Sequence, residues 1–372
     1  MTNVELRIAN CESAARERPL RSALTFRIPH SAFRISPVIP RSQVVLVAAI
    51  AMAGLVSACS SRLDPYFALI ISNIGINIIL AVSLNLINGY TGQFSLGHAG
   101  FMAVGAYTTA AITMFGAPKF APGLTQGAGV HVLFPLALVG GGLAAALVGV
   151  LVGAPSLRLK GDYLAIVTLG FGEIIRVIFR NVDSLGGALG LNGIPAYTNL
   201  FWVYAFAALT VYFVVSMVNS TYGRGFLAVH DDEIAAEAMG INTTRYKITA
   251  FVVGAFFAGV AGGLYGHSIL TIAPTGFDFM RSIEIVVMVI LGGMGNTTGV
   301  IIAAVLLTLL PEGLRMLAGV RVDLPFAAPF NNLKWIADTR MIIYSLLVIV
   351  LMLARPQGLF NWTKRAATKP KI

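Results

Sequence analysis

The residues that could carry out chemistry in this 372-residue chain are few and widely spaced. The sequence contains no G-x-x-x-x-G-K-S/T phosphate-binding loop, no H-E-x-x-H zinc motif and no G-x-S-x-G nucleophile motif. Its two cysteines, Cys11 and Cys59, lie in a basic tail and at the end of an apolar run, and they predict neither a disulfide nor a metal site. Because an enzyme needs titratable groups that converge in a pocket, we expect no catalytic site, no metal and no cofactor of this chain's own.

Two charged pairs interrupt apolar stretches. Glu173 and Arg176 are three residues apart, as are Arg281 and Glu284, and side chains at this spacing can meet on a helix. A charge inside a membrane is costly and is a functional hypothesis by default. Since each pair can neutralise itself, a structural role is at least as well supported. An acid at such a position would also suit a carrier driven by a proton gradient.

A polar loop at 219–247 contains the run EIAAEAMG at residues 233–240. Acidic residues at 231–233 suit the N-terminus of a helix, where they complement its dipole, and Gly240 is a natural stop. We expect a slim surface helix, which is either an ordinary solvated helix or one that docks into a groove of another protein. The residues of that contact would be Glu233, Ala235, Ala236, Glu237, Ala238 and Gly240.

Glycine and amide residues interrupt two further apolar stretches. Non-helical backbone at membrane depth survives only if it is buried in protein or lines a water-filled cavity, where helix ends can bind a charged solute. The alternative is close helix packing through small residues. Asn73, Asn77 and Asn85 share one helical face, where they either bond to a neighbouring helix or line a pathway. The candidate pathway residues are Asn77, Asn85, Gly92, Gln93, Ser95, Gly292, Gly293, Gly295 and Asn296.

The elements that must position these residues are membrane helices. Apolar residues make up 57% of the chain and charged residues 11%, against about 25% charged in a soluble domain. The mean hydropathy of +0.81 excludes a single core surrounded by water, and long apolar runs favour helices over a barrel. The net charge of +10 resides in loops and tails, which indicates membrane topology and not a nucleic-acid surface.

The sequence predicts an all-α polytopic protein of about ten spans, some of them short or interrupted by glycine. Basic loops and tails fall on one side if all ten cross, which predicts that both termini are cytoplasmic. The expected spans lie near 44–59, 66–87, 97–116, 132–153, 162–180, 200–218, 248–270, 282–293, 297–310 and 340–354.

The two ends of the chain differ from the predicted membrane-spanning region 44–360. Residues 1–43 are rich in arginine and proline, and they are either a disordered basic extension or a translated leader. The short run 44–59 ends in Val-Ser-Ala-Cys59, which resembles a lipoprotein signal, but a retained first span accounts better for the topology. Residues 361–372 form a basic tail.

Several motifs in order resemble a known family. Residues 233–241 are similar to the coupling loop of ATP-binding-cassette importer permeases. The other motifs resemble the M-type permease of branched-chain amino-acid transporters, and they are the residues 88–99, 159–163, 186–195, 291–296 and 355–360. The resemblance covers roughly residues 60–362. His230 and Leu185 depart from the family pattern without breaking it.

The resemblance implies a heteromeric importer in the cytoplasmic membrane of a bacterium. A second homologous permease would complete the pathway, two cytoplasmic ATPases would bind the ATP, and an extracytoplasmic binding protein would deliver a small amino acid. Related permeases of this family serve urea, amides and other amino acids, so the exact substrate stays open. The alternative is a channel or secondary transporter driven by an ion gradient, which has no need of a docking helix at 231–240.

Overall fold

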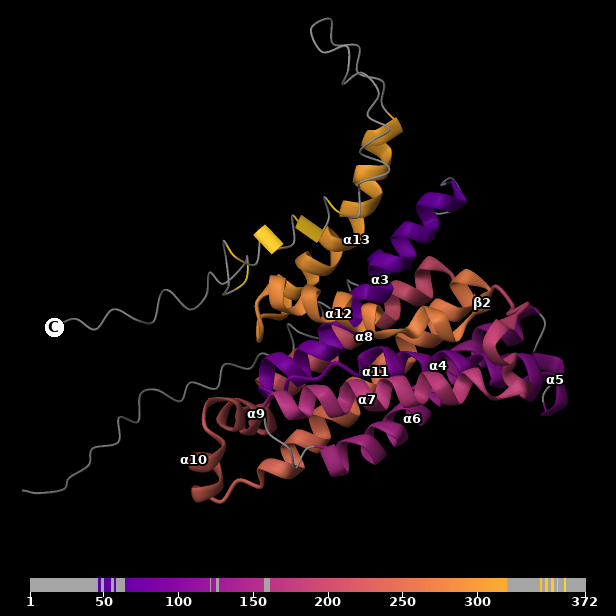
Figure 1. Cartoon of the computed structure of the whole chain (residues 1–372). Helices are drawn as coiled ribbons and strands as arrows, with labels where there is room; N and C mark the ends of the chain where they lie inside the picture. Colours follow the sequence, from indigo (N-terminus) through magenta and orange to yellow (C-terminus); the bar gives the residue numbers. More distant parts are fainter. Residues whose placement is uncertain are drawn as a thin grey trace, which may run out of the picture. The chain divides into compact units, whose positions relative to one another are not determined.

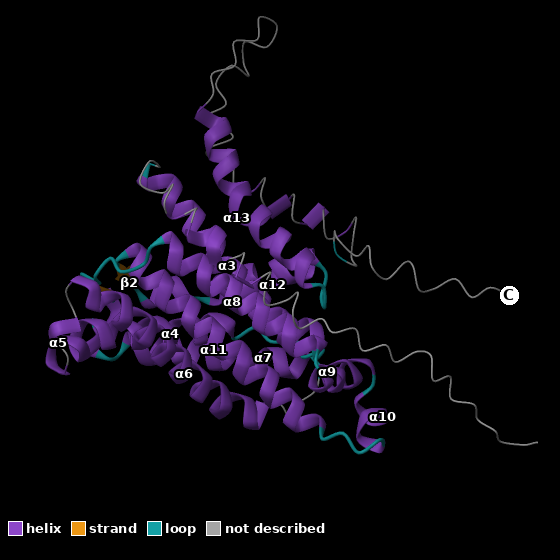
Figure 2. Ribbon diagram, turned by 180° about the vertical axis from the view of Figure 1, so that it is seen from behind, coloured by secondary structure: helices purple, strands orange, loops and turns teal. Residues whose placement is uncertain are grey.

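The described part of the chain is almost entirely helical (Figures 1 and 2). The computed structural model describes residues 64–120, 122–124, 127–156 and 161–319, and isolated residues between 46 and 57 and between 342 and 358. The expected extension 1–43, most of the runs 44–59 and 340–354, and the tail 361–372 lie outside the described residues.

Helices account for nearly every segment that the hydropathy pattern predicts. They are α3 (Pro65–Asn85), α4 (His98–Ala111), α5 (Ala117–Phe120), α6 (Val130–Ser156), α7 (Asp162–Arg180), α8 (Leu200–Asn219), α9 (Thr221–Asp231), α10 (Glu233–Ala238), α11 (Thr243–Ile269), α12 (Phe279–Gly292) and α13 (Thr297–Gly319). Two π-helical turns, Leu86–Tyr90 and Ile112–Gly116, extend α3 and α4. The strands β1 (Leu191–Asn192) and β2 (Thr271–Ile272) pair antiparallel.

Six helical segments of the described chain are long and apolar enough to cross a membrane. They are Pro65–Tyr90, His98–Lys119, Val130–Ser156, Leu200–Asn219, Thr243–Ile269 and Thr297–Met316. The expected spans at 162–180 and 282–293 are also helices, α7 and α12, but neither is both long enough and apolar enough to be counted among these six. α7 carries four charged residues, and the 14 residues of α12 reach about 21 Å, less than the ~30 Å hydrocarbon core. The chain is therefore an all-α polytopic membrane protein.

Helix α11 lies at the centre of one group of helices and packs against α4, α6 and α3. Small residues allow these close approaches: a Cβ atom at Gly105 of α4 would overlap the backbone of Gly259 in α11. Small-residue contacts of this kind replace the hydrophobic driving force that is missing between helices in lipid. α3 in turn packs against α8, α12 and α13. Glycine thus permits close helix packing at Gly105 and Gly259, positions that the sequence analysis did not single out.

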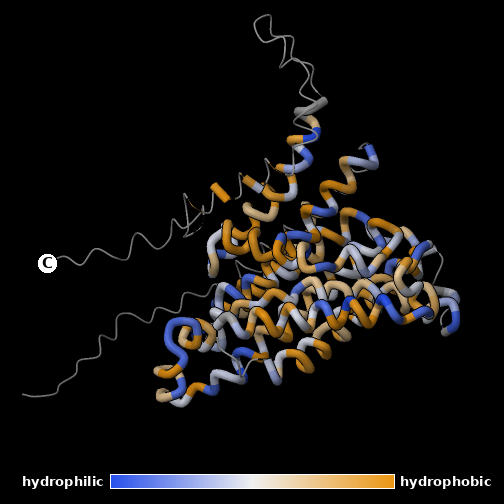
Figure 3. The backbone as a smooth tube through the Cα atoms, viewed as in Figure 1, coloured by the Kyte–Doolittle hydropathy of each residue, from blue (hydrophilic) through white to orange (hydrophobic). Residues whose placement is uncertain are grey.

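The outward face of α6 is apolar. Leu136, Leu143, Leu147 and Leu151 lie along one side of the helix and are 65%, 59%, 65% and 66% exposed. Figure 3 shows the same apolar character along the helices, with hydrophilic residues gathered at the turn from α9 to α10. An exposed apolar face of this extent fits contact with hydrocarbon or with another membrane subunit.

Candidate functional site

The predicted surface helix at 231–240 forms as α10, and the preceding α9 accompanies it (Figure 1). Asp232 caps α10, because its carboxylate accepts hydrogen bonds from the backbone N–H groups of Ile234 and Ala235. At the other end, Gly240 N–H donates to the Glu237 carbonyl and Ile241 N–H to that of Ala236, with Gly240 at φ +83°. These are the two bonds of a Schellman motif, so local sequence alone encodes the start and the end of α10.

Two acidic side chains fasten α10 to the first turns of α11. Glu233 forms an ion pair with Lys247 at 2.6 Å, and the Lys247 side chain is only 9% exposed. Thr243 Oγ1 donates to Glu237 Oε1 at 2.7 Å. Both glutamates were predicted as residues that contact a partner, but their carboxylates bond within the chain. Because they tie α10 to a 27-residue helix, a displacement of α10 acts directly on α11.

The outer side of α10 is apolar, which the sequence analysis did not foresee. Ile234 and Met239 are 75% and 83% exposed, whereas Ala236 is buried beneath the helix. Of the predicted contact residues, Ala235, Ala238 and Gly240 are exposed and Ala236 faces inward. The missed signal was the placement of two large apolar residues on either side of a run of alanines. Large exposed apolar side chains on a short surface helix are typical of a surface that binds a protein partner.

An aromatic cluster holds α9 against α11. Tyr222 and Phe226 of α9 pack around Tyr246 of α11, with ring centroids 4.5 Å and 5.7 Å from the Tyr246 ring. Gly225 allows this approach, because a Cβ atom there would overlap the Tyr246 ring. Tyr222 and Thr249 add a hydrogen bond between hydroxyls at 3.1 Å. α9, α10 and the start of α11 therefore form one tightly connected unit.

The segment between α3 and α4, residues 86–97, is a break in helical structure. It begins with the π-helical turn Leu86–Tyr90, passes through Gly92 at φ +68°, and continues without regular structure to α4. Its backbone is pinned by side chains of other helices: Leu96 N–H donates to Thr168 of α7 and Ala99 N–H, in the first turn of α4, to Ser282 of α12. Residues 86–97 are called the broken segment below.

Unpaired polar atoms concentrate at the broken segment. Of the seven buried side-chain nitrogen and oxygen atoms without a hydrogen-bond partner in the described chain, six belong to residues between Asn85 and His98. They include both amide atoms of Gln93 and the hydroxyl of Ser95. An unpaired buried amide or hydroxyl costs about 1–3 kcal/mol. This concentration marks a place where polar groups serve something other than folding.

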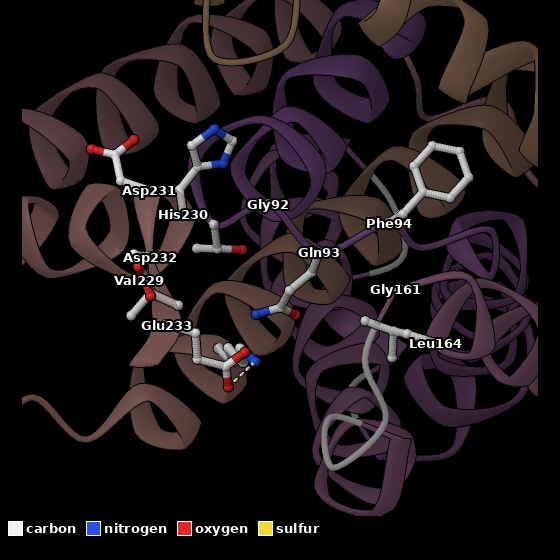
Figure 4. A pocket seen from close by; sticks show the side chains of 12 residues that line it. Gly92, Gln93, Phe94, Gly161, Leu164, Val229, His230, Asp231, Asp232 and Glu233 are labelled. Atoms are coloured by element: carbon white, nitrogen blue, oxygen red, sulfur yellow. Dashed lines mark hydrogen bonds and ion pairs between the residues drawn. The ribbon is translucent and has the colours of Figure 1, made fainter. Parts of the chain in front are cut away.

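A cavity of about 230 Å³ separates the broken segment from the α9–α10 junction. Figure 4 shows the Gln93 side chain entering it from one side and Glu233 from the other, with His230 beside Gly92. The contact between those last two is tight, because a Cβ atom at Gly92 would lie 2.8 Å from His230 Nδ1. The broken segment therefore touches the α9–α10 unit directly.

The second glycine-rich interruption, residues 293–296, meets the first. Gly293 and Gly295 have φ of +94° and +79° and form the tight turn between α12 and α13. Gly295 N–H donates to Asn85 Oδ1 at 2.9 Å, and Tyr90 and Thr297 share a hydrogen bond at 2.8 Å. Asn296 ends the turn by accepting from Gly299 N–H, and Gly292 packs against Val300. The turn 293–296 therefore contacts the end of α3 and the start of the broken segment.

Asn77 belongs to a different group. Its amide donates to Thr308 of α13 and accepts from Arg281 of α12, both at 2.8 Å. Arg281 also pairs with Glu284 at 2.9 Å. The other predicted charged pair, Glu173 and Arg176 of α7, forms at 2.8 Å. The structure thus confirms both i,i+3 pairs and divides the predicted pathway residues into two sets.

Comparison with known proteins identifies the family of this chain. Residues 66–353 match the family described as "Branched-chain amino acid transport system / permease component". The high-affinity branched-chain amino acid transport system permease protein LivM of Salmonella typhimurium is 35% identical over 324 residues, covering 78% of this chain and 68% of that protein. LivM of Escherichia coli is 34% identical over the same shares of each chain.

A shorter match links the chain to a second kind of permease. The high-affinity branched-chain amino acid transport system permease protein LivH of Salmonella typhimurium is 30% identical over 159 residues, 42% of this chain and 47% of that protein. No solved structure matches the chain. From the helical architecture, the motif order and the match over residues 66–353, the chain belongs to the family of branched-chain amino acid transport permease components.

Proposed function

We propose that this chain is the transmembrane permease subunit of an ATP-binding-cassette importer. It translocates branched-chain or related small amino acids across the bacterial cytoplasmic membrane, and partner ATPases drive it. The observation that carries the proposal is α10, a capped helix that exposes Ile234 and Met239 while Glu233 and Glu237 fasten it to α11. A gradient-driven carrier has no need of such a helix.

We infer the full assembly from the family to which the chain belongs. A second permease of the LivH kind would complete the pathway, two cytoplasmic ATPases would bind and hydrolyse ATP, and an extracytoplasmic binding protein would deliver the amino acid. The chain itself spans the membrane ten times with both termini in the cytoplasm. In this arrangement α9 and α10 face the cytoplasm with Arg224, Arg245 and Lys247, in accord with the positive-inside rule.

Coupling proceeds from α10 to the broken segment by direct contact. ATP-driven closure of the ATPases displaces α10, and the tie to Lys247 and Thr243 transfers the displacement to α11. His230 at the end of α9 transfers it to Gly92. Rigid elements in contact transmit such movements when two packings of similar energy exist.

The broken segment and the turn 293–296 line part of the pathway. The unpaired amide of Gln93 and hydroxyl of Ser95 would bind the polar groups of the passing amino acid or the water that accompanies it. Asn85, Gly292, Gly293 and Gly295 shape the backbone around them.

A gradient-driven transporter or channel is the second candidate function. The observation in its favour is the pair of charged side-chain couples, Glu173–Arg176 and Arg281–Glu284, on helices of the bundle. A carrier of this kind would move its substrate without ATP and would depend on one of these acids.

Affinity purification from detergent-solubilised membranes tests the proposal, with partners identified by mass spectrometry. We expect an ATPase and a second permease to co-purify, and Ile234→Asp together with Met239→Asp to abolish recovery of the ATPase. Tyr163→Asp, which alters a residue that is 73% exposed on α7, is the matched control and should leave recovery unchanged. Recovery of the chain alone, with ATP-independent transport after reconstitution, would support the second candidate instead.

A further inference from the structure

Four helices contribute polar groups to one cluster within the bundle, here called the Arg281 cluster: Asn77 of α3, Arg281 and Glu284 of α12, Thr308 of α13, and the ring of Tyr265 of α11. Asn77 accepts a hydrogen bond from Arg281 and donates one to Thr308, each at 2.8 Å. The Arg281 guanidinium also lies 6.0 Å from the centre of the Tyr265 ring. Two neighbouring helices, α3 and α11, therefore contact the Arg281 side chain, and α13 holds Asn77 in place.

The cluster lies at membrane depth. Asn77 is halfway along the candidate span Pro65–Tyr90, and Thr308 is near the middle of Thr297–Met316. Ionised side chains at such depth are rare and costly, and they persist where they face a partner or a hydrated pathway. Apolar residues at both positions of the pair would remove that cost, so neutrality alone does not require the two charges.

The cluster is asymmetric in its exposure. The Arg281 side chain is 20% exposed and anchored to α3, whereas that of Glu284 is 48% exposed. Met280, one turn before Glu284, is 63% exposed on the same face of α12. Within the described chain, α12 packs against α3, α4, α7 and α13 and leaves this face open. A solute that approaches along α12 would reach both charges and an apolar side chain beside them.

We propose that the Arg281 cluster is a binding site for the zwitterionic head group of the transported amino acid. The inference rests on the proposed function. The substrate carboxylate accepts hydrogen bonds from the Arg281 guanidinium, and the substrate ammonium donates to the Glu284 carboxylate. The Arg281–Glu284 pair opens to admit the zwitterion, so one ion pair is exchanged for two and the site stays neutral.

The geometry of the cluster fits this role better than simple charge neutralisation. Arginine presents a planar fork of donors that matches a carboxylate, and Asn77 and Thr308 hold that fork in place before the substrate arrives. Supporting hydrogen bonds of this kind lower the cost of ordering a binding group. The exposed apolar face at Met280 lies where the hydrocarbon side chain of the amino acid would extend.

The chain contains a matched control. Glu173 and Arg176 form the same i,i+3 pair on α7 at 2.8 Å, and their side chains are each 32% exposed. Within the described chain, no side-chain hydrogen bond ties Arg176 to another helix, in contrast to Arg281. If the Arg281–Glu284 pair only neutralised itself, loss of Glu284 should affect leucine binding no more than loss of Glu173 does.

The test uses the purified membrane complex of both permeases and both ATPases. Equilibrium binding of radiolabelled leucine is measured without the binding protein, and ATP-driven leucine uptake is measured with it in proteoliposomes. We expect Glu284→Gln to weaken leucine binding about 10- to 100-fold, the range for one charge-assisted hydrogen bond. Arg281→Lys, which keeps the charge and loses the fork, should weaken it less. Glu173→Gln should leave binding unchanged.

Competition with two analogues separates recognition of the head group from loss of structure. In the parent, a branched amine without the carboxylate and a branched carboxylic acid without the ammonium should both compete only weakly with leucine. In Glu284→Gln the carboxylic acid should compete nearly as well as leucine, because this variant no longer recognises the ammonium. In Arg281→Lys the amine should gain on leucine by a smaller factor, because the lysine keeps the charge but not the fork. Parental leucine binding and uptake in Glu284→Gln would overturn the proposal, as would equal losses in Glu284→Gln and Glu173→Gln accompanied by lower thermal stability. Either result would leave the permease function intact if the complex still couples ATP hydrolysis to uptake.

Discussion

Two residues of the broken segment, Gln93 and Ser95, bury polar groups that have no hydrogen-bond partner in the described chain. Gln93 is 4% exposed and Ser95 fully buried, yet no described residue pairs with the Gln93 amide or the Ser95 hydroxyl. In a membrane protein the cost of such groups is not relieved by bulk water. Under the proposed function they bind a solute or water during transport, and this role predicts an unusual mutational signature.

Replacing these groups with apolar ones should stabilise the protein and impair transport. Because an unpaired buried polar group costs about 1–3 kcal/mol, we expect Gln93→Leu and Ser95→Ala to keep or raise the thermal midpoint of the purified complex. Uptake should fall about tenfold in Gln93→Leu, the equivalent of one lost hydrogen bond of ~1.4 kcal/mol. Thermal unfolding and proteoliposome uptake check both halves, and a lower midpoint in both variants would show that the groups are structural.

Substitution of Gly92 should impair transport through a clash with His230 and not only through backbone strain. Gly92→Ala places a methyl group against His230 at φ +68°, whereas Gly161→Ala introduces the same methyl at φ +61° with no atom within 4 Å. Both variants place a side chain at positive φ, which carries a backbone cost of about 1–3 kcal/mol. We expect only Gly92→Ala to reduce uptake per ATP hydrolysed, by several-fold, and His230→Ala to restore it. Equal effects of the two glycine variants would contradict the contact.

At the scale of elements, α10 is short but held firmly. An isolated helix of six residues would not persist in water, because helix nucleation is unfavourable. Here the Asp232 cap, the Schellman motif and the bonds of Glu233 and Glu237 to α11 supply what length does not. The helix is therefore held firmly enough to transmit a displacement from a partner to the helix bundle.

Breaking the hydrogen bond between α10 and α11 should uncouple amino-acid uptake from ATP hydrolysis. Glu237→Ala and Thr243→Val each remove the 2.7 Å hydrogen bond, so their effects should not add. We expect either variant, and the double variant, to lower uptake per ATP hydrolysed to the same degree while the complex still assembles. Additive losses, measured as uptake and ATP hydrolysis in one proteoliposome preparation, would mean that the two residues act separately. Loss of the chain from the membrane would instead assign Glu237 a role in folding.

At the scale of the whole molecule, the chain matches its family from residue 66 onward. The arginine-rich residues 1–43 precede that match and are predicted to take no part in transport. The α9–α10 unit, the broken segment and every motif except 355–360 lie within the matched range, residues 66–353.

Deletion of residues 2–40 should leave amino-acid uptake within about twofold of the parent, because the variant keeps every contact described above. Uptake in cells and the abundance of the chain in membranes check this expectation. A clear loss of uptake at parental abundance would show that the extension acts in transport.

Much of the fold could be read from local sequence patterns. Apolar runs of sufficient length predict spans, and the expected runs of the described chain all fall on helices, because burial in hydrocarbon requires both apolar side chains and internal backbone pairing. The start and end of α10 were likewise predictable, since caps involve residues within a few positions of each other. The i,i+3 charged pairs are local for the same reason.

The sequence by itself determined that this is a helical membrane protein with a capped polar helix and glycine breaks. Only the tertiary structure decided which of its polar groups meet: Asn85 joins Gly295, Asn77 joins Arg281, and Glu233 joins Lys247. It also decided that Gln93 stays unpaired in a cavity beside the α9–α10 junction. Periodicity specifies the face of a helix but not the helix that covers it, because that choice depends on packing between residues up to about 200 positions apart in the chain.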